Sequence, residues 1–85
     1  MTEIENWAVD YVSTLDQDFA KLSDTEKLSE NLFTSGRLDS MAIMNLLLDA
    51  ENNFNFSFTP EAFQDRRIHK ISGLSKVINE LRGSI

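Results

Sequence analysis

Apolar side chains recur at helical spacing along the first part of the chain, and this periodicity is the strongest constraint on its fold. The repeat comprises Ile4, Trp7, Ala8, Tyr11, Val12, Leu15 and Phe19. Such spacing places these residues on one side of an α-helix. Thr2 is suited to cap the helix, because its hydroxyl can accept a free backbone N–H group of the first turn. We therefore predict a helix over about residues 3–16, with an end that can extend to Phe19.

Residues 20–38 predict a long connection after this helix. The polar residues 23–25 and the Ser35-Gly36 pair are turn-forming, and a short helical turn is expected around residues 25–31. A loop of this length is unusual in a compact domain and is often functional. Four apolar residues are expected to pin it to the core: Leu28, Leu32, Phe33 and Leu38.

A second long helix is expected from Asp39 or Ser40 to about Asn53. Asp39 is suited to cap it, because its carboxylate can accept free N–H groups of the first turn. Its core-facing side is predicted to comprise Ile43, Met44, Leu46, Leu47, Ala50 and Phe54. A different face comprises Met41, Asn45, Leu48 and Asn52. We expect Met41 and Leu48 to face outward beside Ser40.

Residues 54–58, FNFSF, alternate like a short β-strand. No other segment offers this strand a partner, so an extended loop with aromatic side chains in the core is predicted. Thr59 and Pro60 then form a cap and a first helical residue. They predict a short helix over about residues 60–65.

The last helix is expected to begin at a Ser72 cap and to stop at Gly83. Its apolar residues are Leu74, Val77, Ile78 and Leu81. The whole pattern predicts an all-α fold, a small irregular four-helix bundle with a long first loop and a short third helix. The length of 85 residues suits a single domain over residues 1–85.

The charge of the chain is acidic and unevenly distributed. The formal net charge is −6, and residues 1–51 hold 11 acids and 3 bases, whereas residues 52–85 hold 3 acids and 5 bases. An acidic front half argues against nucleic acid as a partner, because phosphates would be repelled. It favours basic partner surfaces, although excess acid also serves solubility alone.

Cysteine is absent from the chain, which excludes disulfides, thiolate metal ligands and a thiol nucleophile. This composition fits a reducing cytoplasm. The N-terminus lacks the pattern of a signal peptide, and no apolar run reaches the roughly 20 residues of a membrane span. We therefore expect a cytoplasmic protein without membrane insertion.

The sequence offers few side chains that could act in catalysis. His69 is the only histidine, and it is predicted to be solvated in a basic loop over residues 66–70. A serine nucleophile needs a base that activates its hydroxyl. Residues 16–18, DQD, lack the continuation of a calcium-binding EF-hand loop. We predict neither an enzyme nor a metal site.

Asp39 and Ser40 allow two interpretations. In one, the pair merely starts a helix. In the other, Ser40 is a handle to which a phosphate-linked group is attached, and that group would lie beside the positive end of the helix. Asp39 would oppose such an anion, yet it could help a separate transferase to hold a metal ion or to orient its partner.

The chain resembles the phosphopantetheine-binding carrier proteins of the acyl and peptidyl carrier type. The resemblance rests on the long loop, on GRLDSM at residues 36–41, on LLLDAENNF at residues 46–54, on the proline-led short helix and on KISGLSKVI at residues 70–78. The family motif centres on Asp-Ser-Leu, and Met41 replaces its leucine. Residues 46–54 and 63–66 are also similar to D-alanyl carrier proteins, whose typical tryptophan after the arginine is absent.

The resemblance implies that Ser40 receives 4'-phosphopantetheine from coenzyme A through a separate phosphopantetheinyl transferase, with Asp39 in support. The arm would hold an acyl or aminoacyl group as a thioester for loading and downstream biosynthetic enzymes. Free-standing carriers of polyketide or nonribosomal peptide pathways fit this pattern, and a monomer is expected. The alternative is a carrier-fold helical interaction domain that acts without covalent modification.

Partner recognition in this family implies a contact face on the second helix and the loop before it. Carried over by position, this face comprises Arg37, Met41, Asn45, Leu48 and Asn52. Asn45 and Asn52 stand where fatty-acid carriers commonly have acids. That departure favours dedicated partners that rely more on apolar contact.

Overall fold

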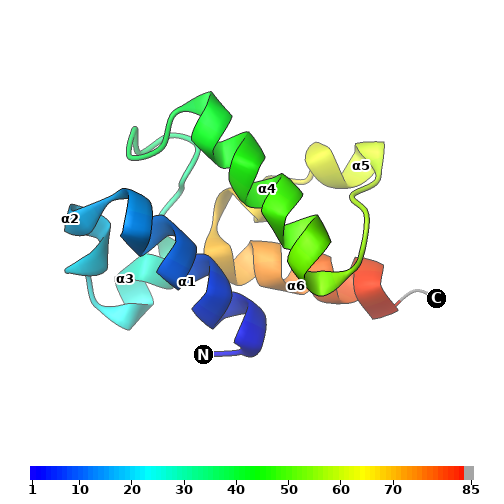
Figure 1. Cartoon of the computed structure of the whole chain (residues 1–85), viewed down its shortest axis with the longest axis horizontal. Helices are drawn as coiled ribbons and strands as arrows, with labels where there is room; N and C mark the ends of the chain where they lie inside the picture. The colour runs from blue at the N-terminus through cyan, green and yellow to red at the C-terminus, as the bar shows by residue number, and fades with distance from the viewer. Residues whose placement is uncertain (84–85) are drawn as a thin grey trace.

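The computed structural model describes residues 1–83, which fold into six α-helices and one 3₁₀ helix, with no strand among them. The elements are α1 (Glu3–Leu15), α2 (Gln17–Ala20), α3 (Asp24–Ser29), α4 (Ser40–Phe54), α5 (Pro60–Phe63), η1 (Arg66–His69) and α6 (Ile71–Gly83). Three of these are long, and the short ones fill the connections between them (Figure 1). The predicted all-α bundle is confirmed, and the final two residues of the predicted domain lie outside the described residues.

Helix α1 begins as predicted and ends earlier than its apolar repeat. The Thr2 hydroxyl accepts the Glu5 N–H while the Glu5 carboxylate accepts the Thr2 N–H, which makes a reciprocal cap. The predicted range of about residues 3–16 is confirmed, and the helix does not extend to Phe19, because Asp16 is extended and separates α1 from α2. Its carboxylate accepts the Asp18 and Phe19 N–H groups, so Phe19 still enters the core from a new helix.

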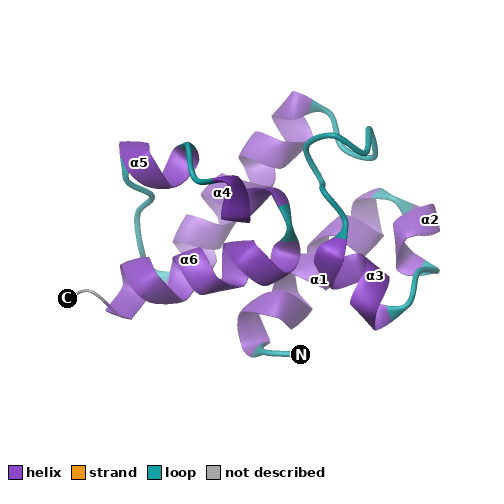
Figure 2. Ribbon diagram, turned by 180° about the vertical axis from the view of Figure 1, so that it is seen from behind, coloured by secondary structure: helices purple, strands orange, loops and turns teal. Residues whose placement is uncertain are grey.

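The long connection contains α3 and then a loop that leads along one end of the molecule to the start of α4 (Figure 2). Leu32 and Leu38 are buried as predicted, and Leu28 and Phe33 pack against the core from partly buried positions. The Leu32 N–H donates to the carbonyl of His69 at 2.7 Å. This hydrogen bond joins the loop to η1, so the connection packs as one side of the fold.

The C-terminal part differs from the prediction at two places. Residues 66–69, expected as a loop, form η1, which is capped by the Asp65 carboxylate. Ser72 is not a cap, because α6 begins at Ile71. The carbonyl of Lys70 accepts the Leu74 N–H at 2.8 Å, so η1 leads into α6 with one extended residue between them.

Gly73 shows why this junction is so tight. A β-carbon at Gly73 would lie 2.2 Å from the backbone oxygen of Arg67, closer than atoms can approach. The missing side chain therefore lets α6 pack directly against η1.

The predicted cap of α5 is confirmed, since the Thr59 hydroxyl accepts the Ala62 N–H and Pro60 is the first helical residue.

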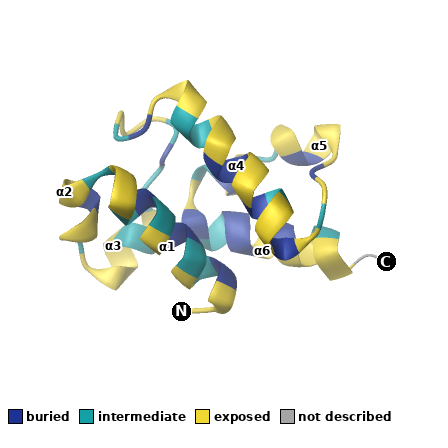
Figure 3. Cartoon of the chain, in the orientation of Figure 1, coloured by how far each residue is buried: buried dark blue, intermediate teal, exposed yellow. Residues whose placement is uncertain are grey.

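The core lies where the three long helices meet. One cluster of buried side chains joins α1, α4, α5, η1 and α6: Ile4, Leu47, Ala50, Phe54, Phe58, Ala62, Ile68, Leu74, Val77 and Ile78. A second joins α1, α2 and the loop to the beginnings of α4 and α6: Ala8, Val9, Val12, Phe19, Leu32, Leu38, Leu46 and Ile71. Figure 3 shows the buried positions as stripes along the long helices. The predicted core side of α4 is wrong at Met44, whose side chain is 47% exposed.

Tyr11 joins α1 to α4 at the edge of the core. Its hydroxyl donates a hydrogen bond of 2.5 Å to the Asp49 carboxylate, and Trp7 packs edge-on against Phe54 on the same pair of helices. Partial burial and the hydrogen bond to Asp49 raise the pKa of Tyr11 from 10.0 to about 12, because both favour the neutral phenol.

We predict that stability falls in alkali through Tyr11. The unfolded chain loses the phenolic proton at about pH 10, so the tyrosine contribution is complete below that pH and is lost as pH rises towards about 12. The chain has one tyrosine, so ultraviolet absorbance follows its titration directly. Asp49→Asn should move the midpoint towards 10, and Tyr11→Phe should flatten the alkaline loss of stability. An ordinary midpoint in the folded protein would contradict this prediction.

Candidate functional site

Ser40 is the first residue of α4, and its side chain is exposed. The Asp39 Oδ1 atom accepts the Ala42 N–H at 2.7 Å, and the Asp39 carbonyl accepts the Ile43 N–H at 3.0 Å. The predicted cap is therefore confirmed. Within residues 1–83 no hydrogen bond engages the Ser40 hydroxyl. The result is an accessible hydroxyl on a rigid helix end.

The loop before Ser40 is held by a glycine turn and an ion pair. Gly36 has a φ of 80°, a left-handed conformation that glycine adopts without strain. The Arg37 Nε donates to the Glu30 carboxylate, and its Nη1 lies 3.7 Å from the Asp16 Oδ1. The hydrogen bond to Glu30 is the main cause that raises the pKa of Arg37 above its ordinary range. Arg37 thus points back to the N-terminal helices.

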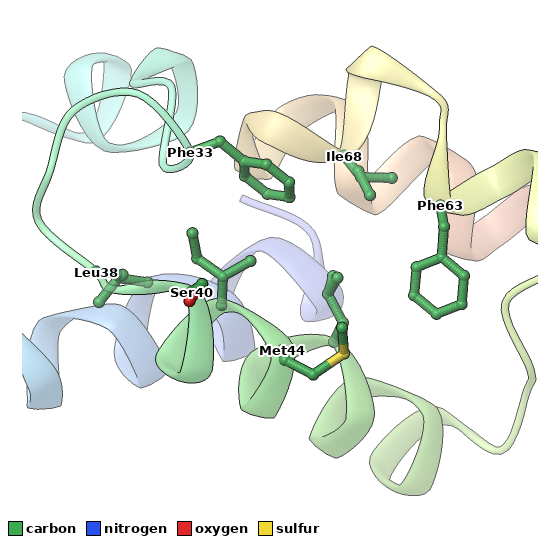
Figure 4. A pocket seen from close by; sticks show the side chains of 8 residues that line it. Phe33, Leu38, Ser40, Met44, Phe63 and Ile68 are labelled. Carbon is green, nitrogen blue, oxygen red and sulfur yellow. The ribbon is translucent and has the colours of Figure 1, made fainter.

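An apolar cavity of about 500 Å³ opens beside Ser40 (Figure 4). It is lined by Phe33, Leu38, Ser40, Ile43, Met44, Leu47, Phe63 and Ile68. These residues come from the loop, from α4, from α5 and from η1. The cavity lies between α4 and α5, because α5 is a single turn and cannot cover the whole flank of α4. Its size falls in the range of ordinary ligand pockets.

The structure places four of the five predicted partner-face residues on the outer side of α4. Met41 is 73% exposed and Leu48 is 46% exposed, and Asn45 and Asn52 are also exposed. The prediction that Met41 and Leu48 face outward is therefore confirmed. Arg37, the fifth, stands apart from this face because its guanidinium is engaged with Glu30 and Asp16.

Sequence reasoning missed two apolar residues at this site. Met44 was assigned to the core, and Phe63 was given no role beyond its place in a short motif. Both line the cavity and remain exposed, Met44 at 47% and Phe63 at 40%. The sequence did hold a signal for Met44. Its three-residue spacing from Met41 places the two methionines on neighbouring parts of one helix face. Nothing in the sequence placed Phe63 on the same cavity as α4, because the path of the chain over residues 55–59 decides where α5 lies.

The acids of α4 and of its cap accept hydrogen bonds from other parts of the chain. Asp49 accepts the Tyr11 hydroxyl, and the Glu51 Oε2 atom accepts the Phe58 N–H at 2.7 Å. Asp39 accepts a backbone N–H at the helix start. The three carboxylates therefore hold the fold together, while the outer face of α4 is built from methionine, leucine and asparagine side chains.

The basic segment at η1 has a structural role. Arg67 pairs with Asp65 at 2.8 Å and with Glu80 at 2.7 Å, which links η1 to α6. The hydrogen bonds from Arg67 lower the pKa of both carboxyls. His69 is not the solvated residue that was expected, because its ring is half-buried and stacks on Phe33 with 4.1 Å between the centroids.

The described part of the chain has neither a cluster of metal-binding side chains nor a helix suited to span a membrane. Residues 1–83 contain no cluster of three or more histidine, cysteine, aspartate or glutamate side chains that could hold a metal ion. None of the described helices has the length and apolar character needed to cross a membrane.

The fold and the site together define a class of protein. A small helical bundle that presents one free serine hydroxyl at the head of a long helix is arranged like a carrier domain, whose serine is a substrate for other enzymes. A family model described as "Phosphopantetheine attachment site" matches residues 10–76. The chain therefore belongs to this family, whose prosthetic group is 4'-phosphopantetheine. No curated protein and no solved structure matched the chain in the corresponding searches, so the similarity to D-alanyl carriers stays unsupported.

The residues present fit a phosphopantetheine group. The Ser40 hydroxyl is exposed and makes no hydrogen bond within residues 1–83, so another enzyme can reach it. A phosphate there would lie at the positive end of the 15-residue helix α4. When bound, the group supplies a thiol that this cysteine-free chain lacks. The chain's own part is to hold and present the attachment point.

We predict that Asp39 contributes to stability through the cap alone. Asp39→Ala should lower the free energy of unfolding by about 0.5–2 kcal/mol, because the Ala42 N–H loses its acceptor. Asp39→Asn keeps a capping oxygen and should stay near wild type. Urea unfolding measures both variants, and equal stability of the alanine variant and wild type would remove the capping role.

Proposed function

We propose that Ser40 carries 4'-phosphopantetheine and that the chain holds an acyl or aminoacyl group as a thioester on this arm. It would present the group to partner biosynthetic enzymes, as a cytoplasmic monomer without catalysis of its own. The observation that carries the proposal is the free, exposed Ser40 hydroxyl at the start of α4, inside the family match. Polyketide or nonribosomal peptide synthesis is the functional setting that we propose.

The environment of Ser40 argues against the chain as its own enzyme. A serine nucleophile needs a base within hydrogen-bond reach. His69, the only histidine, stacks on Phe33, and its backbone carbonyl holds Leu32. The Ser40 hydroxyl has no partner among residues 1–83. Asp39 supports the site by capping α4, which fixes the position of Ser40 relative to the loop.

The proposal predicts modification at Ser40 and nowhere else. Incubation with coenzyme A and a broad-specificity phosphopantetheinyl transferase should add one phosphopantetheine group by intact mass. Ser40→Ala should abolish the addition. Ser35→Ala, which alters an exposed serine in the loop before α4, should leave the addition unchanged. An unmodified wild-type chain beside an active control carrier would refute the attachment proposal and favour a carrier-fold interaction domain that works without the arm.

We also propose that Met41, Asn45, Leu48 and Asn52 form the partner face, with Arg37 acting indirectly by holding the loop. Because Leu48 is 46% exposed, Leu48→Glu should change the free energy of unfolding by no more than about 0.5 kcal/mol. The same variant should lower kcat/KM of the phosphopantetheinyl transferase about tenfold or more, because an apolar contact at an interface centre is replaced by a charge.

Asn53→Glu is the matched control for this face. It adds the same charge to an exposed position on a different side of α4, so transferase kinetics should stay near wild type. Marked unfolding of the Leu48→Glu protein in a thermal melt, or an equal kinetic loss in both variants, would count against the proposed face.

A further inference from the structure

A second cavity lies where the long connection, η1 and the start of α6 meet. Its volume is about 370 Å³, which is within the range of small-ligand pockets. Three of its lining residues, Arg66, Arg67 and Lys70, are basic, and no aspartate or glutamate lines it. This lining contrasts with the formal net charge of −6 for the whole chain. The cavity is therefore suited to an anion.

Four polar groups that border this cavity have no partner among residues 1–83, and each of them can donate a hydrogen bond. Arg66 and Lys70 are exposed and take part in no ion pair there. The Asn31 Oδ1 atom accepts two backbone N–H groups at 2.9 and 3.1 Å, which leaves the NH₂ group of this amide free. The Ser72 hydroxyl is also free. The cavity thus offers a guanidinium, an ammonium, an amide NH₂ and a hydroxyl to one ligand.

The acids that pair with this basic segment are held by Arg67. Its guanidinium lies 2.8 Å from the Asp65 carboxylate and 2.7 Å from the Glu80 carboxylate. Because both carboxylates accept hydrogen bonds from Arg67, they do not serve as counter-ions for Arg66 and Lys70. An anion from outside the chain would therefore meet two free positive charges without displacing an internal partner.

Contacts between the three segments fix the backbone around this cavity. The Leu32 N–H donates to the His69 carbonyl at 2.7 Å, which joins the long connection to η1. Gly73 lies so close to Arg67 that a β-carbon would be 2.2 Å from the Arg67 backbone oxygen, which joins η1 to α6. The backbone positions that carry the four donors are therefore set before a ligand arrives, and this lowers the ordering cost of binding.

We propose that this cavity binds a small phosphate anion, either free phosphate or pyrophosphate or the phosphate group of a monoester. A phosphate has several acceptor oxygens, so it can accept from Arg66, Lys70 and the Asn31 amide together. Hydrogen bonds from charged donors to phosphate are roughly twice as strong as neutral ones. The bound anion joins the connection that leads to Ser40 to η1 and stabilises the fold. Ser40 does not line this cavity, so the site does not depend on the proposed attachment.

The test uses the full unmodified chain, labelled for amide NMR and titrated with inorganic phosphate, pyrophosphate or glycerol phosphate. Sodium chloride keeps the ionic strength constant, because exposed charges respond to salt alone. We expect saturable shifts of the Asn31 side-chain NH₂ signal and of the backbone N–H signals of residues 70–73. At about ten times Kd, the anion should raise Tm by about 5 °C. A response to the two inorganic anions alone assigns the site to the free anion, whereas a response to all three includes phosphate monoesters.

Two variants test the donors against a matched control. Lys70→Ala and Asn31→Asp each lower the net charge by one, as does Lys76→Ala at an exposed lysine of α6 outside the cavity. Asn31→Asp keeps an oxygen for the two backbone N–H groups and replaces the NH₂ donor by a second oxygen. Lys70→Ala should weaken binding about tenfold, and Asn31→Asp by at least as much. Lys76→Ala should stay within about twofold of wild type, because solvent screens a distant surface charge.

Three results would overturn the proposed site. If none of the anions produces a saturable shift, the cavity does not bind phosphate. If sodium chloride alone produces the same shifts, they report screening. If Lys76→Ala weakens binding as much as Lys70→Ala, the chain attracts anions through its overall charge. Thermal melts without anion first establish that each variant is folded, and Arg66→Ala gives a second test of the basic lining.

Discussion

The packing of α4 against α1 and α6 is the interaction on which the rest of the structure depends. Leu47, Ala50 and Phe54 are buried along one stripe of α4, and this stripe fixes the rotation of the helix about its axis. Once that rotation is set, Met41 and Leu48 must face solvent, and Ser40 must stand free at the exposed end. The burial of one face thus decides what the other face can present to a partner.

Around this helix, the short elements determine the chemistry that the site can offer. The loop before α4 is tied down by backbone and side-chain hydrogen bonds, including the one from Leu32 to His69, so it forms a firm wall. On the other side, α5 has only four residues and leaves part of α4 uncovered. Because one side is closed and the other is only partly covered, an apolar cavity lies next to the exposed Ser40 hydroxyl, and no charged side chain lines it.

The predictions that succeeded depend on local physics. Thr2, Asp39 and Thr59 were recognisable as caps because a short polar side chain before an apolar run can satisfy the first free N–H groups of a helix. The predictions that failed involve competition between neighbouring elements. Ser72 carries the right side chain for a cap, yet η1 brings the chain into α6 at Ile71, two residues before the helix that a Ser72 cap would start. Asp16 ends α1 inside a continuous apolar repeat, because its carboxylate starts a second helix.

The sequence by itself determined the helical class, the capped start of α4, the family motif around Ser40 and the outward direction of Met41 and Leu48. These follow from side-chain type and spacing within a single helix, which the linear order of residues contains. Only the tertiary structure decided that Met44 and Phe63 line one cavity from two elements. It also decided that Asp49 accepts a hydrogen bond from α1 and that Glu51 accepts one from the chain after α4. Such pairings join residues on different elements, and their distance depends on how the connecting turns direct each helix, which no local pattern encodes.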